Sequence, residues 1–175
     1  MLSWLRLARA SLAPSIAWDW AAGILLCGLA WSPSHLTLLL ILLAMHACIL
    51  MLGGKYTYAE VPLGFWVRDA FGLARNHYDR LGHFAQGFVP AILAREILWR
   101  RSPLRGSRWL PFVVVSICLA FSACYEFLEW WTALATGEGA TAFLGTQGDV
   151  WDTQWDMFLA GCGAVLAQVL LGGIH

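Results

Sequence analysis

The stretch Leu36-Thr-Leu-Leu-Leu-Ile-Leu-Leu-Ala-Met-His-Ala-Cys-Ile-Leu-Met-Leu52 contains one histidine and no formally charged residue. A transmembrane helix needs about 20 mostly apolar residues, because each residue rises 1.5 Å and the hydrocarbon core is about 30 Å thick. The whole chain has the same character, since 59% of its 175 residues are hydrophobic and 13% are charged, about half the charged share of a soluble domain. The sequence therefore predicts one integral membrane domain, residues 1–175, with the lipid bilayer as its main partner.

Four further apolar segments indicate an all-α, polytopic transmembrane helix bundle. The five predicted spans are residues 16–31, 36–52, 81–99, 109–135 and 150–174. Gly53-Gly54 is expected to end the second span. The next segment, residues 55–80, mixes charged and aromatic residues, which is typical of an interfacial or re-entrant segment. A crossing by residues 58–73 would give six spans, so both counts stay open.

The charge balance excludes some classes of protein. Eleven Lys and Arg residues against eleven Asp and Glu residues give a net charge of zero, so we expect no nucleic-acid partner. The excess of apolar side chains excludes a disordered chain. The five cysteines form no CxxC pair and are interpreted as small apolar residues.

The orientation follows from the arginine-rich loop at residues 100–108, which has four arginines and no acidic residue. Lysine and arginine accumulate in short cytoplasmic loops. This loop is therefore expected inside, and the segment around Asp79 at the opposite, outer face. The reverse orientation is the alternative.

Most charged residues near membrane depth lie at three predicted helix ends: the start of the third span, the end of the fourth and the start of the fifth. Antiparallel connectivity brings these ends to one side of the membrane, and spacings of three or four residues place side chains on one helix face. The residues concerned are Asp79, His83, Glu126, Glu129, Asp152 and Asp156.

These acidic residues need compensation, because a carboxylate in a membrane span costs roughly 2.5–3.5 kcal/mol. Arginine partners such as Arg75 and Arg80, shared protons or a divalent cation would supply it. Carboxylate and imidazole ligands suit Mg²⁺, Mn²⁺, Ca²⁺ or Zn²⁺. We therefore predict a metal site formed by the six residues above, and the candidate catalytic residues are Asp79, His83 and Glu126.

Each of these residues also has a structural explanation when it is taken alone. Glu126 and Glu129 lie near a helix end, where they would reach interfacial water. Asp152 lies near a helix N-terminus, where an acidic side chain is favoured by the helix dipole. Only the coincidence of the residues on one side of the bundle favours a site.

Long motifs after the second span resemble the YjdF family of bacterial inner-membrane proteins. They are Lys55-Tyr-Thr-Tyr-Ala-Glu-Val-Pro-Leu-Gly64, Asn76-His-Tyr-Asp-Arg-Leu-Gly-His-Phe-Ala-Gln-Gly-Phe-Val-Pro90, Ser122-Ala-Cys-Tyr-Glu-Phe-Leu-Glu-Trp-Trp131 and Gly145-Thr-Gln-Gly-Asp-Val-Trp-Asp-Thr-Gln-Trp-Asp-Met157. The resemblance implies a multi-pass protein of the bacterial inner membrane. It does not by itself imply a reaction.

A more distant resemblance is to VanZ-like proteins. It rests on Asp79-Arg80-x-x-His83-Phe84, on Tyr125-Glu126, and on Asp152-x-x-x-Asp156 followed by glycines. Glu129 stands where that pattern has Gln, and Asp156 stands where it has Asn. Both differences make the pocket more acidic, so the resemblance implies a related fold more than a shared ligand.

Three functions agree with this pattern. The first is a metal-dependent hydrolase or transferase that acts on a lipid-linked or cell-envelope substrate. The second is a small proton- or cation-coupled transporter, because intramembrane acidic residues and histidines form proton relays. The third is a structural membrane protein whose acidic residues pair with arginines. The sequence leaves open whether the chain is an enzyme, and it leaves the oligomeric state open.

Overall fold

The computed structural model describes residues 33–136 and 147–173. Within these ranges every regular element is a helix, which confirms the predicted all-α class. The helices are α2 (Pro33–Tyr56), α3 (Pro62–Phe71), α4 (Tyr78–Arg101), α5 (Trp109–Thr136) and α7 (Asp152–Leu171). The span predicted at residues 16–31 lies outside the described residues.

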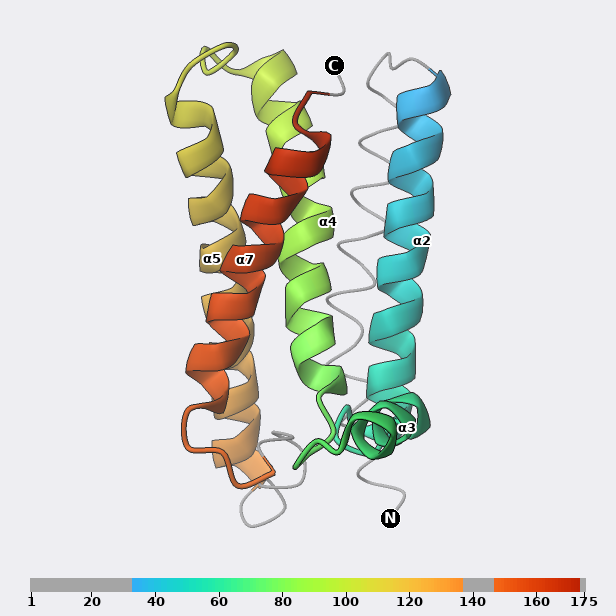
Figure 1. Ribbon diagram of the computed structural model, residues 1–175. Coiled ribbons are helices and arrows are strands. Elements are labelled where there is room, and N and C mark those ends of the chain that lie inside the picture. The colour runs from blue at the N-terminus through green and yellow to red at the C-terminus, as the bar shows by residue number, and fades with distance from the viewer. Residues whose placement is uncertain (1–32, 137–146, 174–175) are drawn as a thin grey trace.

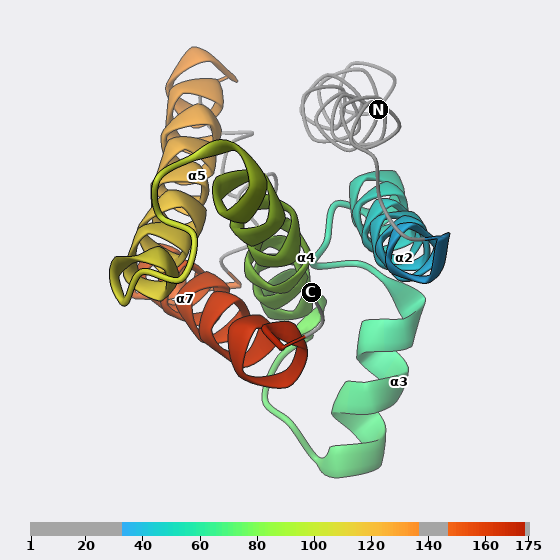
Figure 2. The same ribbon diagram turned by 90° about the horizontal axis from the view of Figure 1, so that it is seen from above.

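The four long helices run side by side (Figure 1), and α4 lies between α2 on one side and α5 and α7 on the other (Figure 2). Helices α4 and α7 make the closest contact. A side chain at Gly87 would collide with the backbone of Ala160, and one at Gly163 would collide with the backbone of Phe84. Small residues allow such close approach between helices in lipid. The α4–α7 pair therefore forms the rigid centre of the bundle.

Three of the described helices are long and apolar enough to cross a membrane: Leu36–Tyr56, Trp109–Ala135 and Asp152–Leu171. They match the spans predicted at residues 36–52, 109–135 and 150–174, with small shifts of the boundaries. Their outer surfaces carry large apolar side chains, for example Met45, Leu134 and Val169, which are 57%, 66% and 74% exposed. Apolar surface of this extent needs a lipid environment.

Helix α4 contains the span predicted at residues 81–99, and its 24 residues give a length of about 36 Å. It is not among the helices that are apolar enough to span a membrane. Several of its polar side chains, including Asp79, His83 and Glu96, are buried. A crossing by α4 therefore stays a prediction.

The connection between α2 and α4 differs from the predicted one. Helix α2 does not end at Gly53-Gly54 but continues to Tyr56, because the glycine serves packing: a side chain at Gly53 would collide with the Tyr58 ring. Helix α3 has ten residues and rises only about 15 Å, half of the hydrocarbon thickness. It lies at one end of the bundle, near the end of α2, and runs roughly perpendicular to the long helices (Figures 1 and 2), so in this position it does not form a sixth span.

Candidate functional site

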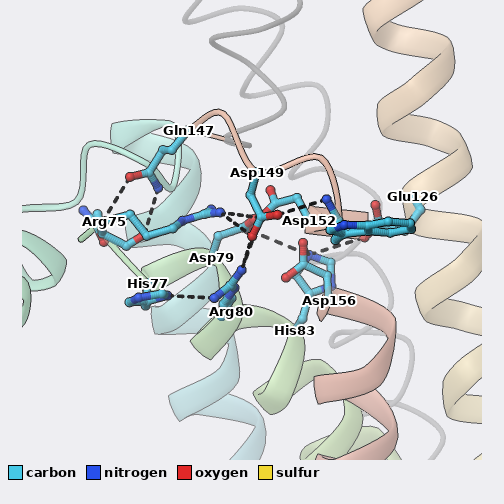
Figure 3. A network of polar contacts seen from close by, with 12 residues as sticks. Arg75, His77, Asp79, Arg80, His83, Glu126, Gln147, Asp149, Asp152 and Asp156 are labelled. Atoms are coloured by element: carbon cyan, nitrogen blue, oxygen red, sulfur yellow. Dashed lines mark hydrogen bonds and ion pairs between the residues drawn. The ribbon is translucent and has the colours of Figure 1, made fainter. Parts of the chain in front are cut away.

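A histidine surrounded by three carboxylates lies at the end of the bundle near α3 (Figure 3). The Nε2 atom of His83 is 3.7 Å from Asp79 Oδ1, 3.6 Å from Glu126 Oε1 and 4.0 Å from Asp156 Oδ2. Helix α4 supplies Asp79 and His83 one turn apart, α5 supplies Glu126, and α7 supplies Asp156. We call these four residues the inner cluster.

The inner cluster is enclosed by protein. The exposed fractions of its residues are 6% for Asp79, 3% for His83, 8% for Glu126 and 3% for Asp156. Three of its atoms, His83 Nδ1, Glu126 Oε1 and Asp156 Oδ1, are buried and have no hydrogen-bond partner among the described residues, and the same holds for the hydroxyl of the fully buried Ser122, one turn from Glu126 on α5. Buried polar atoms are costly unless they are paired. The cluster therefore has the chemistry of a ligand site.

A second group of charges lies next to the inner cluster (Figure 3), and in this group opposite charges are paired. Arg75 Nη1 is 2.7 Å from Asp152 Oδ1, Arg80 Nη2 is 2.6 Å from Asp149 Oδ2, and Arg75 is also 3.5 Å from Asp149. We call these four residues the outer network. Two guanidinium groups face two carboxylates, so the network balances its own charge.

Asp149 lies in the connection that precedes α7, outside the membrane-spanning segments. The backbone N–H of Trp151 donates to Asp149 Oδ1 at 3.0 Å. This hydrogen bond and the positive charges of Arg80 and Arg75 lower the pKa of the Asp149 carboxyl below its ordinary value. Asp149 is therefore ionised at any pH near neutrality.

Two amide side chains hold the loops that carry the outer network. The buried Asn76 donates from Nδ2 to the carbonyls of Ala59 and Val61, each at 3.0 Å, and its Oδ1 accepts a hydrogen bond from the backbone N–H of Tyr78. Its own backbone exchanges two hydrogen bonds with the Gln147 side chain. The segment before α4 is thereby fixed against the segment before α7.

The sequence did not single out Asn76 and Gln147 as functional. A lone amide in a loop has no spacing that distinguishes it from other polar loop residues. Their one signal is that both lie inside the long motifs that resemble the YjdF family. The family resemblance, and not the helical periodicity, is therefore the signal that could have pointed to these two residues.

The six predicted metal ligands divide into three groups. Asp79, His83, Glu126 and Asp156 come together in the inner cluster, as described above. Asp152 instead pairs with Arg75 in the outer network, because the segment before α4 brings the guanidinium to the first turn of α7. Glu129 is half-buried and does not belong to the three-residue group that offers closely spaced ligand atoms.

The inner cluster has the size and charge to hold a divalent cation. Ligand atoms of Asp79, His83 and Asp156 lie within 4.8 Å of one another, and bonds from Mg²⁺ or Zn²⁺ to such ligands are about 2.0–2.2 Å long. Among the described residues, the only ion-pair partner within 4.0 Å of Asp79, Glu126 or Asp156 is His83. Three buried carboxylates without an arginine or lysine need a cation or shared protons.

Comparison with known proteins agrees with the membrane character of the chain. A family model described as predicted membrane protein (DUF2238) matches residues 20–175. The inner membrane protein YjdF of Escherichia coli (strain K12) is 56% identical over 138 residues, which cover 79% of this chain and 66% of that relative. No solved structure matches the chain. These findings support the resemblance to the YjdF family, while the resemblance to VanZ-like proteins stays a hypothesis.

Proposed function

The chain belongs to the DUF2238 family of predicted membrane proteins, and we propose that its inner cluster is a divalent-cation site of a membrane-embedded hydrolase or transferase. The family, the similarity to an inner membrane protein and the three helices of spanning length support an inner-membrane location. We place the inner cluster at the outer face, because the arginine-rich loop between α4 and α5 lies at the other end of the bundle (Figure 1) and favours the cytoplasm.

One observation carries the proposal: three buried carboxylates surround a buried imidazole, and within residues 33–136 and 147–173 no guanidinium or ammonium group lies within 4.0 Å of them. In the outer network the same fold brings arginines to acidic side chains at 2.6–2.7 Å. Arg75 and Arg80 lie in that adjacent network (Figure 3). A divalent cation bound by Asp79, His83 and Asp156, with Glu126 beside them, would offset this charge.

The donor set limits the choice of cation. One imidazole with two or three carboxylates is a ligand set that suits Mn²⁺ or Zn²⁺, and it accommodates Mg²⁺ or Ca²⁺ less well because these ions prefer oxygen. A cation held here by Asp79, His83 and Asp156 would supply Lewis acidity toward a phosphoryl or acyl oxygen and toward bound water. Glu126, beside these ligands, would act as the general base that takes the proton of that water.

The position of the site supports a lipid-linked or cell-envelope substrate. The inner cluster lies near the end of the bundle at which α3 is placed (Figure 1). Exposed aromatic side chains, including Trp66 on α3 and Trp130 and Trp131 on α5, are of the kind that gathers at the membrane–water interface. The headgroup of an amphipathic substrate lies at this level of the membrane, while its apolar tail stays in the lipid.

Metal analysis of the purified protein tests the cation site. After removal of metal with a chelator, the wild-type chain is titrated with Mn²⁺ and with Zn²⁺, and bound metal is measured by mass spectrometry. We expect about one ion per chain, and binding at least tenfold weaker in His83→Ala, Glu126→Gln and Asp156→Asn, because even the loss of an outer-shell partner costs ten- to a hundredfold.

Matched controls remove the same side-chain types outside the inner cluster. Asp149→Asn removes a carboxylate of the outer network, and His77→Ala removes a histidine that contacts Arg80. Both are expected to bind metal within about threefold of wild type. Absence of metal from the wild-type protein, or equal loss in the controls, contradicts the proposal.

The alternative functions give other results in the same protein preparations. If the acidic residues only fix the fold, the cluster variants lose thermal stability together with expression, and wild type binds no metal. If the chain transports protons or cations, vesicles that contain wild type show a flux with a pH-sensitive dye, and Asp156→Asn abolishes it. For the enzyme, release of phosphate from a polyprenyl diphosphate in liposomes is expected to require the cation and Glu126.

A further inference from the structure

A small cavity borders the inner cluster on the side of α2. It has room for about one water molecule, and it touches the cluster through Asp79 and His83. Five of its seven lining residues carry polar groups: Tyr58, Asp79, His83, Gln86 and Tyr125, beside Leu50 and Gly82. Neither tyrosine has a role in the cation site described above, so the cavity requires its own explanation.

Tyr58 reaches this cavity through an uncommon backbone conformation. Thr57 and Tyr58 both have positive φ angles, 59° and 51°, in the left-handed region that a β-branched or bulky residue adopts only at a conformational cost. Such conformations persist only where the surrounding structure enforces them, and they cluster at functional sites. The turn therefore gives Tyr58 a position that an unstrained chain would not give it.

Two glycines make room for the Tyr58 ring. A side chain at Gly53 on α2 would collide with the ring, and a Cβ atom at Gly82 on α4 would lie 3.4 Å from Tyr58 Cε1. The ring also lies 6.5 Å from the Tyr78 ring, measured between centroids. Helices α2 and α4 thus hold the side chain from both sides, and its hydroxyl is set at the cavity.

The second tyrosine comes from α5 and completes the lining. The Tyr125 ring packs edge-on against His83 with 6.2 Å between the ring centroids, and Tyr58 and Tyr125 both line the cavity. The ordinary pKa of tyrosine is about 10, so a tyrosine hydroxyl keeps its proton near neutral pH and can donate a hydrogen bond.

These observations point to an oxygen ligand. Phenolic hydroxyls donate hydrogen bonds to an oxygen that carries negative charge, and the cavity is too small for more than one such atom. We propose that Tyr58 and Tyr125 bind a water or hydroxide that also contacts the cation of the inner cluster, so that Tyr58 positions the attacking oxygen. This inference rests on the proposed function, because it requires the cation.

Fluoride is a suitable probe, since it has the size of hydroxide, binds to metal ions and accepts hydrogen bonds. The protein is loaded with Mn²⁺, and fluoride binding is followed by the paramagnetic relaxation of the ¹⁹F nucleus. In Tyr58→Phe the ring is kept and the hydroxyl is lost. We expect Mn²⁺ affinity within about threefold of wild type and fluoride affinity about tenfold or more weaker, the range of a hydrogen bond to a charged group.

The matched control is Tyr78→Phe. The Tyr78 hydroxyl donates to the carbonyl of Ile49 at 3.1 Å, and Tyr78 does not line the cavity, so this variant is expected to bind fluoride as wild type does. Tyr125→Phe is the second test variant and is expected to behave like Tyr58→Phe. Retained Mn²⁺ binding shows that each variant is folded.

The outcomes separate the inference from the proposed function. If wild type binds no Mn²⁺, the cation site is wrong and the inference falls with it. If Mn²⁺ binds but wild type takes up no fluoride, or fluoride binds equally to wild type and Tyr58→Phe, the cation site stands and the inference is wrong. An equal loss of fluoride binding in Tyr78→Phe also overturns it.

Discussion

The inner cluster and the outer network are adjacent, yet the distance from their carboxylates to the arginines differs between the two groups. In the outer network Asp149 and Asp152 each meet a guanidinium within 2.7 Å. One turn further along α7, the ion-pair partner of Asp156 among the described residues is the His83 imidazole at 4.0 Å. Arg75 and Arg80 lie at this end of the bundle but pair with the outer network. The contrast favours the proposed cation, or protons shared among the carboxyls, as the compensation of the inner cluster.

The largest expected effect comes from removing an arginine of the outer network. Arg75→Met leaves Asp152, whose side chain is 5% exposed, without its closest charge partner. Loss of one partner of a buried ion pair typically costs about 3–5 kcal/mol. Equilibrium unfolding in mixed detergent micelles, followed by tryptophan fluorescence, is expected to show a loss of this size.

The double variant Arg75→Met/Asp152→Leu is the control for that experiment. Replacement of both charges by apolar groups is often neutral or stabilising, so most of the lost stability should return. A loss of less than about 1 kcal/mol in Arg75→Met would contradict the view that this pair is a buried ion pair.

The second prediction has the opposite sign and concerns the inner cluster. In chelator, Asp156→Asn is expected to be at least as stable as wild type, because it removes one of three crowded buried carboxylates. With Mn²⁺ at about a hundred times its dissociation constant, wild type should gain about 2.7 kcal/mol, and Asp156→Asn should gain much less. If Asp156→Asn instead destabilises the metal-free protein as Arg75→Met does, the contrast between the two groups is lost.

A smaller effect is expected from Arg80→Met. Its partner Asp149 is 25% exposed and keeps the hydrogen bond from the Trp151 backbone, so the carboxylate stays solvated. The loss also includes the cation–π contact of Arg80 with Trp155, at 5.5 Å. We expect a loss of stability clearly smaller than that of Arg75→Met, because partly exposed ion pairs contribute little. A loss of stability equal to that of Arg75→Met would show that burial does not determine which of these two ion pairs contributes more to stability.

The smallest expected effect is a dependence of stability on pH that Asp149 produces. Its pKa lies below the ordinary value of 3.8, so its ionised form stabilises the fold above that value, and this contribution is lost as the pH falls through the lower, folded-state pKa. Thermal midpoints of wild type and Asp149→Asn are compared from about pH 3 to about pH 7. The advantage of wild type should be constant above about pH 4 and shrink below it. A change between pH 6 and pH 7 would assign the effect to another group.

Much of the fold could be predicted because lipid imposes a simple rule on sequence. Apolar runs of spanning length predicted α2, α5 and α7, and helical spacing predicted that Asp79 and His83 share a face. Antiparallel connectivity then placed Glu126 and Asp156 near them. These inferences need only the helix period and the thickness of the bilayer.

The parts that sequence reasoning missed depend on contacts between distant segments. Gly53 was interpreted as a helix end, whereas it makes room for the Tyr58 ring. Arginine partners such as Arg75 were expected for the acidic residues as a group, but only the structure shows that Arg75 pairs with Asp152, whose role as a metal ligand stays a prediction. In both cases the role of the residue depends on a side chain from a distant segment that packs against it. The spacing of residues along one helix does not predict such a contact.

The amino-acid sequence by itself determined that this protein lies in a lipid bilayer, that it is helical and that its acidic residues gather at one end of the bundle. Each of these properties follows from local hydropathy and from the order of the helices. Only the tertiary structure decided which acidic residues are paired and which are not. The assignment of Arg75 and Arg80 to Asp152 and Asp149, and the approach of Tyr58 to His83, depend on angstrom-scale distances between segments far apart in the chain. Coulomb energies and hydrogen bonds change steeply over such distances.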